Sequence, residues 1–255
     1  MTVIITVAGI SSRFNKNHED NHLKAIYFEE DILDTLLYKL LKKFSAADRI
    51  IIVGGYKYAE LKNYLRNNIC ASLSKKIVTV YNEFFQTYSS GYSLYVGLNQ
   101  AFEEDAQTIV FAEGDLDVDT ESVVKVISST KNVITYTSCP IYSDKSVVLY
   151  QNSADKYKYI FNYEHGLLRI EEPFKCIFNS GQIWKFNDIE KLKIANKKFY
   201  EEDREDTNLG IIQRYFDVVP IAEIELIHIA HWLNCNTRDD YKLAKNFWRN
   251  SNGIF

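Results

Sequence analysis

The first 120 residues alternate apolar runs with amphipathic segments four times, and this pattern restricts the fold more than any other feature. We predict strands at Thr2–Val7, 49–53, Ile77–Tyr81 and 108–112. Helices are predicted between them at 33–44, 57–66 and 93–102. Parallel strands need crossover connections, so this alternation predicts an α/β fold with a mostly parallel sheet flanked by helices.

Beyond Val133 the pattern becomes richer in strands. We predict β-structure at 145–150, 157–161, 167–171 and 177–186, and a last strand at Ile224–Ile229. Helices are expected at 188–200 and 207–216, and a final helix should follow Thr237, whose spacing from Asp240 resembles a capping box. Since no linker, repeat or Pro/Gly-rich break is present, we expect one domain over 1–255.

Composition excludes several classes of protein. With 255 residues, 46% of them hydrophobic and only 3 prolines, the chain can bury a large core, so it is neither disordered nor collagen-like. The net charge of −4 disfavours nucleic-acid binding. The four cysteines lie far apart without metal-site spacing, and the apolar N-terminus lacks a basic leader region, so we expect a cytoplasmic protein with reduced cysteines and no membrane insertion. The cysteines are Cys70, Cys139, Cys176 and Cys235.

The loop after the first strand combines small residues with cations. Residues 8–13 read Ala-Gly-Ile-Ser-Ser-Arg, and Lys24 stands eleven positions beyond Arg13. Small side chains let backbone N–H groups approach phosphate oxygens, while Arg and Lys neutralise charge. The segment therefore suggests a triphosphate cradle, with an ordinary strand-to-helix loop carrying solvated cations as the alternative.

A run of carboxylates ends the fourth predicted strand. Asp115 lies just beyond this strand, after Glu113 and Gly114, and is the best single candidate for a magnesium ligand, since hard cations prefer oxygen. An EF-hand fails here because Thr120 and Val126 replace the required Gly and Glu. Asp119 or Thr120 is instead expected to cap the following helix.

The segment 232–237 should close a strand with two amides, Asn234 and Asn236, on one face. Such amides more often form turns than bind metals. The nearby His228 and His231 are expected to be packed or solvated rather than to share a metal.

Together these segments resemble the sugar-phosphate and phosphocholine nucleotidyltransferase superfamily over nearly the whole chain. Residues 8–13 and Lys24 are similar to its Ala-Gly-x-Gly-Ser-Arg signature and catalytic lysine, and Gly114-Asp115 to its metal-binding aspartate. The remaining similarities are 82–94 to the segment lining the base pocket, Glu171 and 179–181 to residues contacting the acceptor, and 232–241 to the closing Trp-x-Asp-x-x-Thr-x-x-Asp stretch.

This resemblance implies a Rossmann-like nucleotidyltransferase fold with an inserted α+β acceptor-binding subdomain. The nucleotide-binding half would span about 1–135 and the acceptor-binding and closing half about 136–255. The chain's size and its residues 88–93 and 205–207 look most like the choline-phosphate cytidylyltransferase branch, which includes capsule and lipopolysaccharide modification enzymes and phosphoglutamine cytidylyltransferases. CTP and a small phosphomonoester are the implied substrates, with CMP transferred and pyrophosphate released.

The resemblance also implies residue roles. Lys24 would contact the α-phosphate, Arg13 the β- and γ-phosphates, and Asp115 with Asn234 or Asn236 would hold magnesium. Nucleotide-binding residues would be Ala8, Gly9, Ser11, Ser12, Arg13, Asn82, Ser93 and Gly114, and acceptor-binding residues Glu171, Asn179, Trp184 and Asp206. Ser11 replaces a family glycine, and the two asparagines replace Glu and Asp, so we expect a tighter loop and a weaker metal shell.

Two questions stay open from the sequence. An aromatic wall of Trp184, Tyr142 and Tyr163 would suit a quaternary ammonium acceptor, whereas Lys145, Arg169 and Arg204 would suit a carboxylate or phosphate. Two other functions also compete: a nucleotide-sugar glycosyltransferase using Asp115-Leu116-Asp117 as a D-x-D metal site, and an inactive nucleotide-binding homologue, suggested by the two asparagines.

Overall fold

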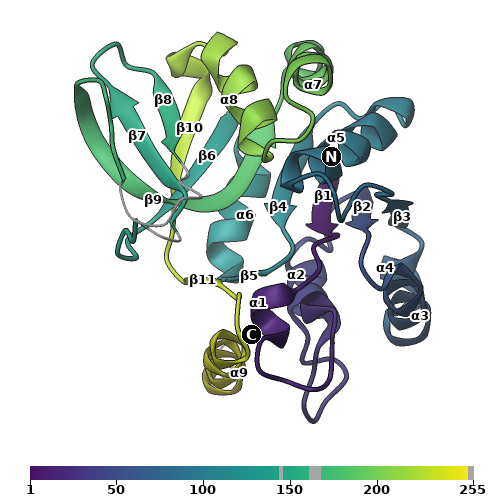
Figure 1. Cartoon of the computed structure of the whole chain (residues 1–255). Coiled ribbons are helices and arrows are strands. Elements are labelled where there is room, and N and C mark those ends of the chain that lie inside the picture. The colour runs from purple at the N-terminus through teal and green to yellow at the C-terminus, as the bar shows by residue number, and fades with distance from the viewer. Residues whose placement is uncertain (144–145, 161–167, 252–255) are drawn as a thin grey trace.

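The computed structural model describes residues 1–143, 146–160 and 168–251, and within these ranges nine strands form one sheet (Figure 1). Its order is β10-β6-β9-β4-β1-β2-β3, with β7 on β9 and β8 on β7. The strands are β1 (Thr2–Val7), β2 (Arg49–Gly54), β3 (Ile77–Tyr81), β4 (Ile109–Glu113), β6 (Asn132–Thr137), β7 (Val148–Asn152), β8 (Tyr157–Ile160), β9 (Phe174–Phe186) and β10 (Ile224–Ile229).

Strand direction divides the sheet into two parts. β1 to β4 are mutually parallel, and β6 is parallel to β10. The long β9 lies between β4 and β6 and is antiparallel to both. The predicted α/β class is therefore confirmed, and β9 with the β7–β8 pair supplies antiparallel strands in the region beyond Val133 that was predicted to be rich in strands.

Helices cover both faces of the sheet. One face packs against α2 (Leu36–Lys43), α3 (Tyr58–Asn68), α4 (Ala71–Ser74) and α6 (Thr120–Ser128). The other packs against α5 (Ser90–Glu103), α7 (Ile189–Glu202) and α8 (Leu209–Val218). Shorter or peripheral elements are α1 (Ser12–Asn15), η1 (Lys24–Ile26), η2 (Ile221–Glu223) and α9 (Arg238–Ser251).

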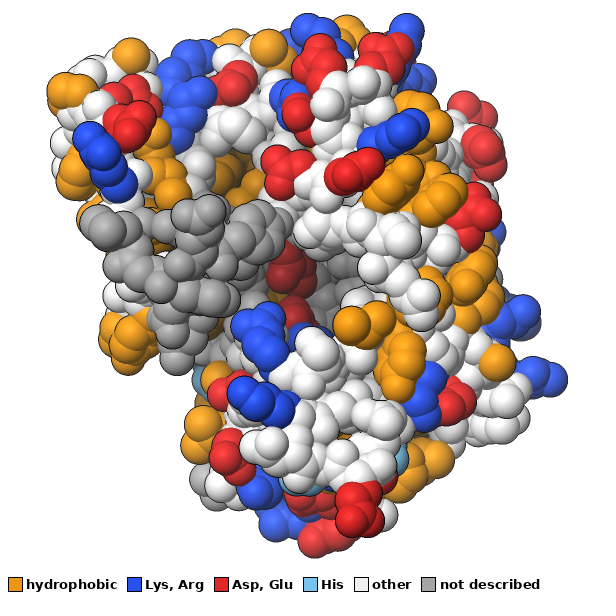
Figure 2. All heavy atoms as spheres, in the orientation of Figure 1, with side chains coloured by type: hydrophobic (Ala, Val, Ile, Leu, Met, Phe, Trp, Pro, Cys, Tyr) orange, Lys and Arg blue, Asp and Glu red, His pale blue; other side chains and the backbone are white. Residues whose placement is uncertain are grey.

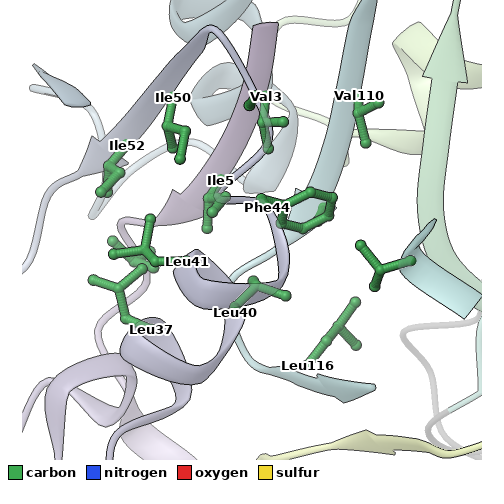
Figure 3. Packing of buried hydrophobic residues seen from close by; sticks show 14 of the residues in the cluster. Val3, Ile5, Leu37, Leu40, Leu41, Phe44, Ile50, Ile52, Val110 and Leu116 are labelled. Atoms are coloured by element: carbon green, nitrogen blue, oxygen red, sulfur yellow. The ribbon is translucent and has the colours of Figure 1, made fainter. Parts of the chain in front are cut away.

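Two apolar cores follow from the two-residue period of the strands. Val3 and Ile5 of β1 point to the α2 side, while Ile4 points to the α5 side, and all three are fully buried. Figure 3 shows Leu40 of α2 and the following Phe44 facing these strands. Burying one such large apolar side chain contributes roughly 1.5–3 kcal/mol, so the alternating pattern of β1 stabilises both helix layers at once.

A small second sheet carries the C-terminal segment to the end of β4. β5 (Leu116–Val118) pairs antiparallel with β11 (Trp232–Asn234), and the Cys235 N–H donates to the Asp115 carbonyl at 2.8 Å. We did not predict a strand at 116–118, since three residues are too short to show periodicity. This pairing brings the residues after β11 beside Asp115.

Most of the predicted elements agree with the structure, with shifted ends. Thr2–Val7, Ile77–Tyr81 and Ile224–Ile229 match residue for residue. The helix predicted from 33 starts at Leu36 because the Thr35 side chain caps it, accepting from the Tyr38 N–H at 3.1 Å. The strand predicted at 167–171 is wrong for 168–171, which lack a strand; residue 167 lies outside the described ranges.

Two predicted helix caps are confirmed. Asp119 accepts from the Ser122 N–H at 2.7 Å and caps α6. Asp240 accepts from the Thr237 N–H at 2.8 Å, while its own N–H donates to Thr237 Oγ1 at 3.1 Å, which is a reciprocal capping box. In the described part of the chain, no helix has both the length and the apolar character needed to cross a bilayer.

Candidate functional site

A cavity of about 380 Å³ opens at the carboxyl ends of β1 and β4. Figure 2 shows a hollow with acidic side chains deep inside it and basic side chains on its rim. Ten of the residues proposed from the sequence line this cavity. They are Ala8, Gly9, Ser11, Ser12, Arg13, Lys24, Ser93, Gly114, Asp115 and Asn236.

The loop after β1 has a left-handed backbone at Ser11. Its φ of 57° lies in the region that favours glycine and that residues with a side chain rarely adopt. The serine side chain adds a contact that glycine lacks, because its Oγ accepts from the Lys24 N–H at 3.2 Å. Ser11 therefore ties the loop to the start of η1, where Lys24 lies.

Lys24 and Asp115, 91 residues apart in sequence, meet at the cavity wall. Lys24 Nζ lies 2.6 Å from Asp115 Oδ2 and 3.3 Å from Asn236 Oδ1. Both charged side chains are largely buried, with exposed fractions of 20% and 17%. A cation and a carboxylate thus face the same space, next to the exposed side chain of Arg13.

Carboxylate and amide oxygens, the kind of ligand that magnesium prefers, lie at this wall. Asp115 Oδ1 is buried and has no hydrogen-bond partner, so it remains free for a ligand. Asn236 presents its oxygen to Lys24, whereas the Asn234 oxygen is already used by Asn236 Nδ2 at 2.7 Å. No cluster of three or more His, Cys, Asp or Glu side chains suited to a metal occurs among the described residues, so a metal here would depend on Asp115 and on substrate oxygens.

Glu113 also lines the cavity, although we did not single it out from the sequence. Its Oε1 accepts from Asn208 Nδ2 at 2.7 Å. Burial and then the neighbouring Asp115 carboxylate raise the pKa of Glu113 to about 7, against the opposing hydrogen bond from Asn208 and the charges of Lys24 and Arg13. The sequence did contain a signal that could have identified Glu113 as a site residue: it lies two residues before Asp115, so the two acidic residues flank Gly114.

Glu113→Gln is expected to stabilise the protein at alkaline pH. The pKa of Glu113 is higher in the folded protein than its ordinary value of 4.5. Glu113 therefore lowers the unfolding free energy little at pH 4.5, and this loss of stability grows until the pH passes about 7. The substitution should therefore raise the unfolding free energy by on the order of 2–3 kcal/mol at pH 8 and by far less at pH 4.5. Thermal unfolding at both pH values measures this.

The matched control is Glu171→Gln, since the Glu171 side chain is 78% exposed. It should leave the melting temperature unchanged at both pH values. If Glu113→Gln raised the unfolding free energy equally at pH 4.5 and pH 8, the raised pKa of Glu113 would not be the cause of the effect.

Gly114 is required by a close backbone approach between β4 and β1. A Cβ atom there would lie 2.3 Å from Val7 Cγ1 and 2.7 Å from the Thr6 carbonyl oxygen. Gly114→Ala should therefore lower stability by about 1–3 kcal/mol, measured by denaturant unfolding. Gly9→Ala is the control, because nothing lies within 4 Å of a Cβ at Gly9, and equal losses in both variants would argue against the steric cause.

Asn82, proposed from the sequence as a nucleotide-binding residue, does not line the cavity itself. The side chain is fully buried; its Nδ2 donates to Ser93 Oγ and its Oδ1 accepts from the Phe84 N–H, both at 2.9 Å. Asn82 instead supports Ser93, which does line the cavity.

Trp184, proposed from the sequence as an acceptor-binding residue, is a core residue and does not line the cavity. It has no exposed surface, stacks on Phe111 with ring centroids 5.3 Å apart, and donates to the Tyr159 hydroxyl at 2.6 Å. Its position between two strands in the middle of the sheet buries it, which an aromatic in a strand-like run could not reveal.

The other proposed acceptor residues do not meet at the cavity. Glu171 lies exposed beside Arg169, with 3.6 Å between the charged groups. Asn179 is buried and donates to the Pro140 carbonyl, while the Asp206 side chain accepts from the adjacent Thr207 N–H at 2.7 Å. None of these side chains is part of the cavity wall.

The alternative acceptor residues are dispersed too. Tyr142 is half exposed, and the Arg204 guanidinium lies 5.9 Å from the ring centre of Tyr88, which lines the cavity, and of Tyr200. Lys145 and Tyr163 lie outside the described residues.

Asp117 does not line the cavity, so the two carboxylates of the Asp115-Leu116-Asp117 motif do not face the same space. The residue is 1% exposed, and its carboxylate accepts from His231 Nε2 at 2.8 Å, Trp248 Nε1 at 2.9 Å and Lys43 Nζ at 3.3 Å. Burial raises the pKa of Asp117, but these partners outweigh burial and hold the pKa below its usual value. Asp117 therefore anchors α2 and α9 to β5. The nearby His228 instead contacts Ser138, so the two histidines share no ligand.

Known nucleotidyltransferases have the same fold. The inositol-1-phosphate CTP transferase from T. maritima has a TM-score of 0.66 at 13% identity, covering 96% of this chain and 94% of that chain. For the CTP:phosphocholine cytidylyltransferase (LicC) from Streptococcus pneumoniae the TM-score is 0.61 at 16% identity, with coverages of 96% and 98%. For a UDP-glucose pyrophosphorylase in complex with UDP-glucose the TM-score is 0.66 at 11% identity, and the match covers 98% of this chain and 98% of that chain.

The sequence comparisons add one match. A family model described as Domain of unknown function (DUF6564) matches residues 20–248. No curated protein sequence matches the chain.

Proposed function

Since this chain belongs to the family described as Domain of unknown function (DUF6564) and has the nucleotidyltransferase fold, we propose that it is a CTP-dependent cytidylyltransferase. It would transfer CMP to a small phosphorylated acceptor and release pyrophosphate. Two of the structures compared above are of enzymes named for CTP, which supports this nucleotide.

One observation carries the proposal: the Ala8–Arg13 loop, Lys24 and Asp115 line the same cavity, with Lys24 Nζ 2.6 Å from Asp115. The pair is neutral together, so both groups can lie largely buried before a substrate arrives. A magnesium–nucleotide complex would bring a new anion for Lys24 and a new cation for Asp115. Such a pair therefore suits a charged, metal-bound substrate.

In the proposed reaction an acceptor phosphate oxygen attacks the α-phosphorus of CTP. A P–O bond forms there, the bond to the oxygen bridging the β-phosphorus breaks, and pyrophosphate leaves with the electron pair. Lys24 would neutralise charge at the α-phosphate, Arg13 would bind the β- and γ-phosphates, and backbone N–H groups of 8–12 would orient the nucleotide. Ser93, supported by Asn82, would lie nearer the base.

Magnesium would be held by Asp115 and by substrate oxygens, because Asn236 Oδ1 already accepts from Lys24 and Asn234 Oδ1 already accepts from Asn236. When bound, it would offset charge on the phosphate oxygens. The neutral amides add no charge of their own, so the ion would depend strongly on Asp115 and the triphosphate.

The proposed acceptor is choline phosphate, phosphoglutamine or a similar phosphomonoester used in surface polysaccharide modification. This part rests on the sequence resemblance to the choline-phosphate branch. A nucleotide-sugar glycosyltransferase is disfavoured because Asp117 is buried and bonded to three partners.

The test is a pyrophosphate-release assay. Pure protein is incubated with magnesium, each of the four nucleoside triphosphates and a panel of phosphomonoesters. Pyrophosphate from CTP with one acceptor supports the proposal. Consumption of a nucleotide sugar would support the glycosyltransferase, and nucleotide binding without turnover would support an inactive homologue.

A further inference from the structure

A row of three amide side chains leads from β9 through β11 to Lys24. Asn234 Nδ2 donates to Gln182 Oε1 at 2.8 Å, and Asn236 Nδ2 donates to Asn234 Oδ1 at 2.7 Å. Lys24 Nζ then donates to Asn236 Oδ1 at 3.3 Å, beside its contact with Asp115. The row therefore connects the interior of the sheet with the cavity wall.

The hydrogen bonds of this row all run in one direction. Each asparagine donates toward Gln182 and presents its oxygen toward Lys24. A reversed Asn236 would turn its NH₂ group toward the ammonium, and two donors cannot pair. The direction of the row thus decides whether Lys24 meets an acceptor.

Gln182, at the β9 end of the row, is buried and has an unusual backbone conformation. It is 3% exposed, and its φ of 56° lies at an irregularity in the pairing of β9 with β6. The Gln182 N–H donates to Ser180 Oγ at 3.2 Å, and Trp232 Nε1 donates to the Gly181 carbonyl at 3.0 Å. These contacts hold the backbone at Gln182 and the side chain that starts β11, so the row begins from a fixed stretch of main chain.

We propose that Gln182 is a positioning residue for Lys24: its Oε1 accepts from Asn234 and so supports the Asn234–Asn236 amides, which hold the ammonium at the cavity wall. The expected effect of Gln182 on turnover rests on the proposed function. The row gives Lys24 a second hydrogen-bond acceptor without a second negative charge. The ammonium is therefore held in position, while Asp115 remains the one carboxylate in contact with it that competes with an incoming phosphate.

The kinetic test compares Gln182→Met, which removes the acceptor at similar size, with Gln182→Glu, which keeps an acceptor oxygen. Gln182→Met should lower kcat about tenfold, as expected for weakening one charge-assisted hydrogen bond, with a smaller change in KM for CTP. Gln182→Glu should retain most of the turnover. Loss of turnover in both variants to the same extent would overturn the proposal.

A double-mutant cycle tests whether the row acts as a unit. Gln182→Met combined with Asn236→Ala should be no slower than the slower single variant, because both interrupt the same row. Multiplying effects would overturn the inference. If Gln182→Met does not fold, Asn234→Ala replaces it in the cycle, because this variant interrupts the same row at a partly exposed position.

A readout without turnover separates this inference from the proposed function. Trinitrobenzene sulfonate labels free amines, and peptide mass spectrometry reports the labelling of each lysine. Lys24 should react several-fold faster in Gln182→Met than in the original protein, while the exposed Lys16 of the same loop should react equally in both. Equal labelling of Lys24 would overturn the positioning role even if the protein proved to have no transferase activity; faster labelling would support it in that case.

Discussion

Lys24→Ala is expected to lower pyrophosphate release by ~10²–10³-fold, the usual cost of removing one preorganised charge partner. In the structure the Lys24 ammonium is already at the wall of the cavity, between Asp115 and Asn236. Alanine would leave the Asp115 carboxylate without its cation and the phosphates without this positive charge. Steady-state assays of pyrophosphate release with CTP and the preferred acceptor measure the effect.

Lys16→Ala is the matched control for this variant, because Lys16 is an exposed lysine in the same loop that does not line the cavity. It should keep normal turnover. Circular dichroism should show that Lys24→Ala remains folded. Near-normal turnover in Lys24→Ala would refute the role of this residue.

Asp115→Asn is the second large expected effect. Its Oδ1 is the buried carboxylate oxygen without a partner at the cavity, and its Oδ2 holds Lys24. The amide would add no negative charge for a cation, so turnover should fall by ~10²-fold or more and half-maximal activity should need more magnesium. A magnesium titration of pyrophosphate release in both proteins checks this expectation.

The control is Glu121→Gln, whose side chain is 80% exposed on α6. Its magnesium dependence should match that of the original protein. If Asp115→Asn also kept the original dependence, the proposed metal site would be wrong.

Local patterns predicted the framework well because each element depends mainly on its own residues. The apolar runs of β1, β3 and β10 have the predicted bounds, and the caps at Asp119 and Thr237 follow from side chains close to the backbone groups they satisfy. The loop 8–13, Lys24 and Asp115 could be proposed together because they follow strands that end at the same edge of a parallel sheet.

Other features depend on contacts between distant segments. Trp184 and Asn82 carry no local signal for burial, which comes from their places within the packed sheet and beneath Ser93. The pairing of β5 with β11 joins segments more than 100 residues apart, and it brings Asn236 to Lys24. Nothing near Gln182 in sequence indicates that its side chain meets Asn234.

By itself, the order of apolar and polar residues determined the α/β architecture, the positions of most of the strands and the loop that offers N–H groups and cations at their ends. Those properties repeat along the chain with the period of a helix or strand, so neighbouring residues are enough to specify them. Only the tertiary structure decided that Glu113 shares the cavity, that Asp117 is withdrawn from it, and that three amides are aligned toward Lys24. Hydrogen-bond direction and burial arise between segments brought together by folding, so no local pattern contains them.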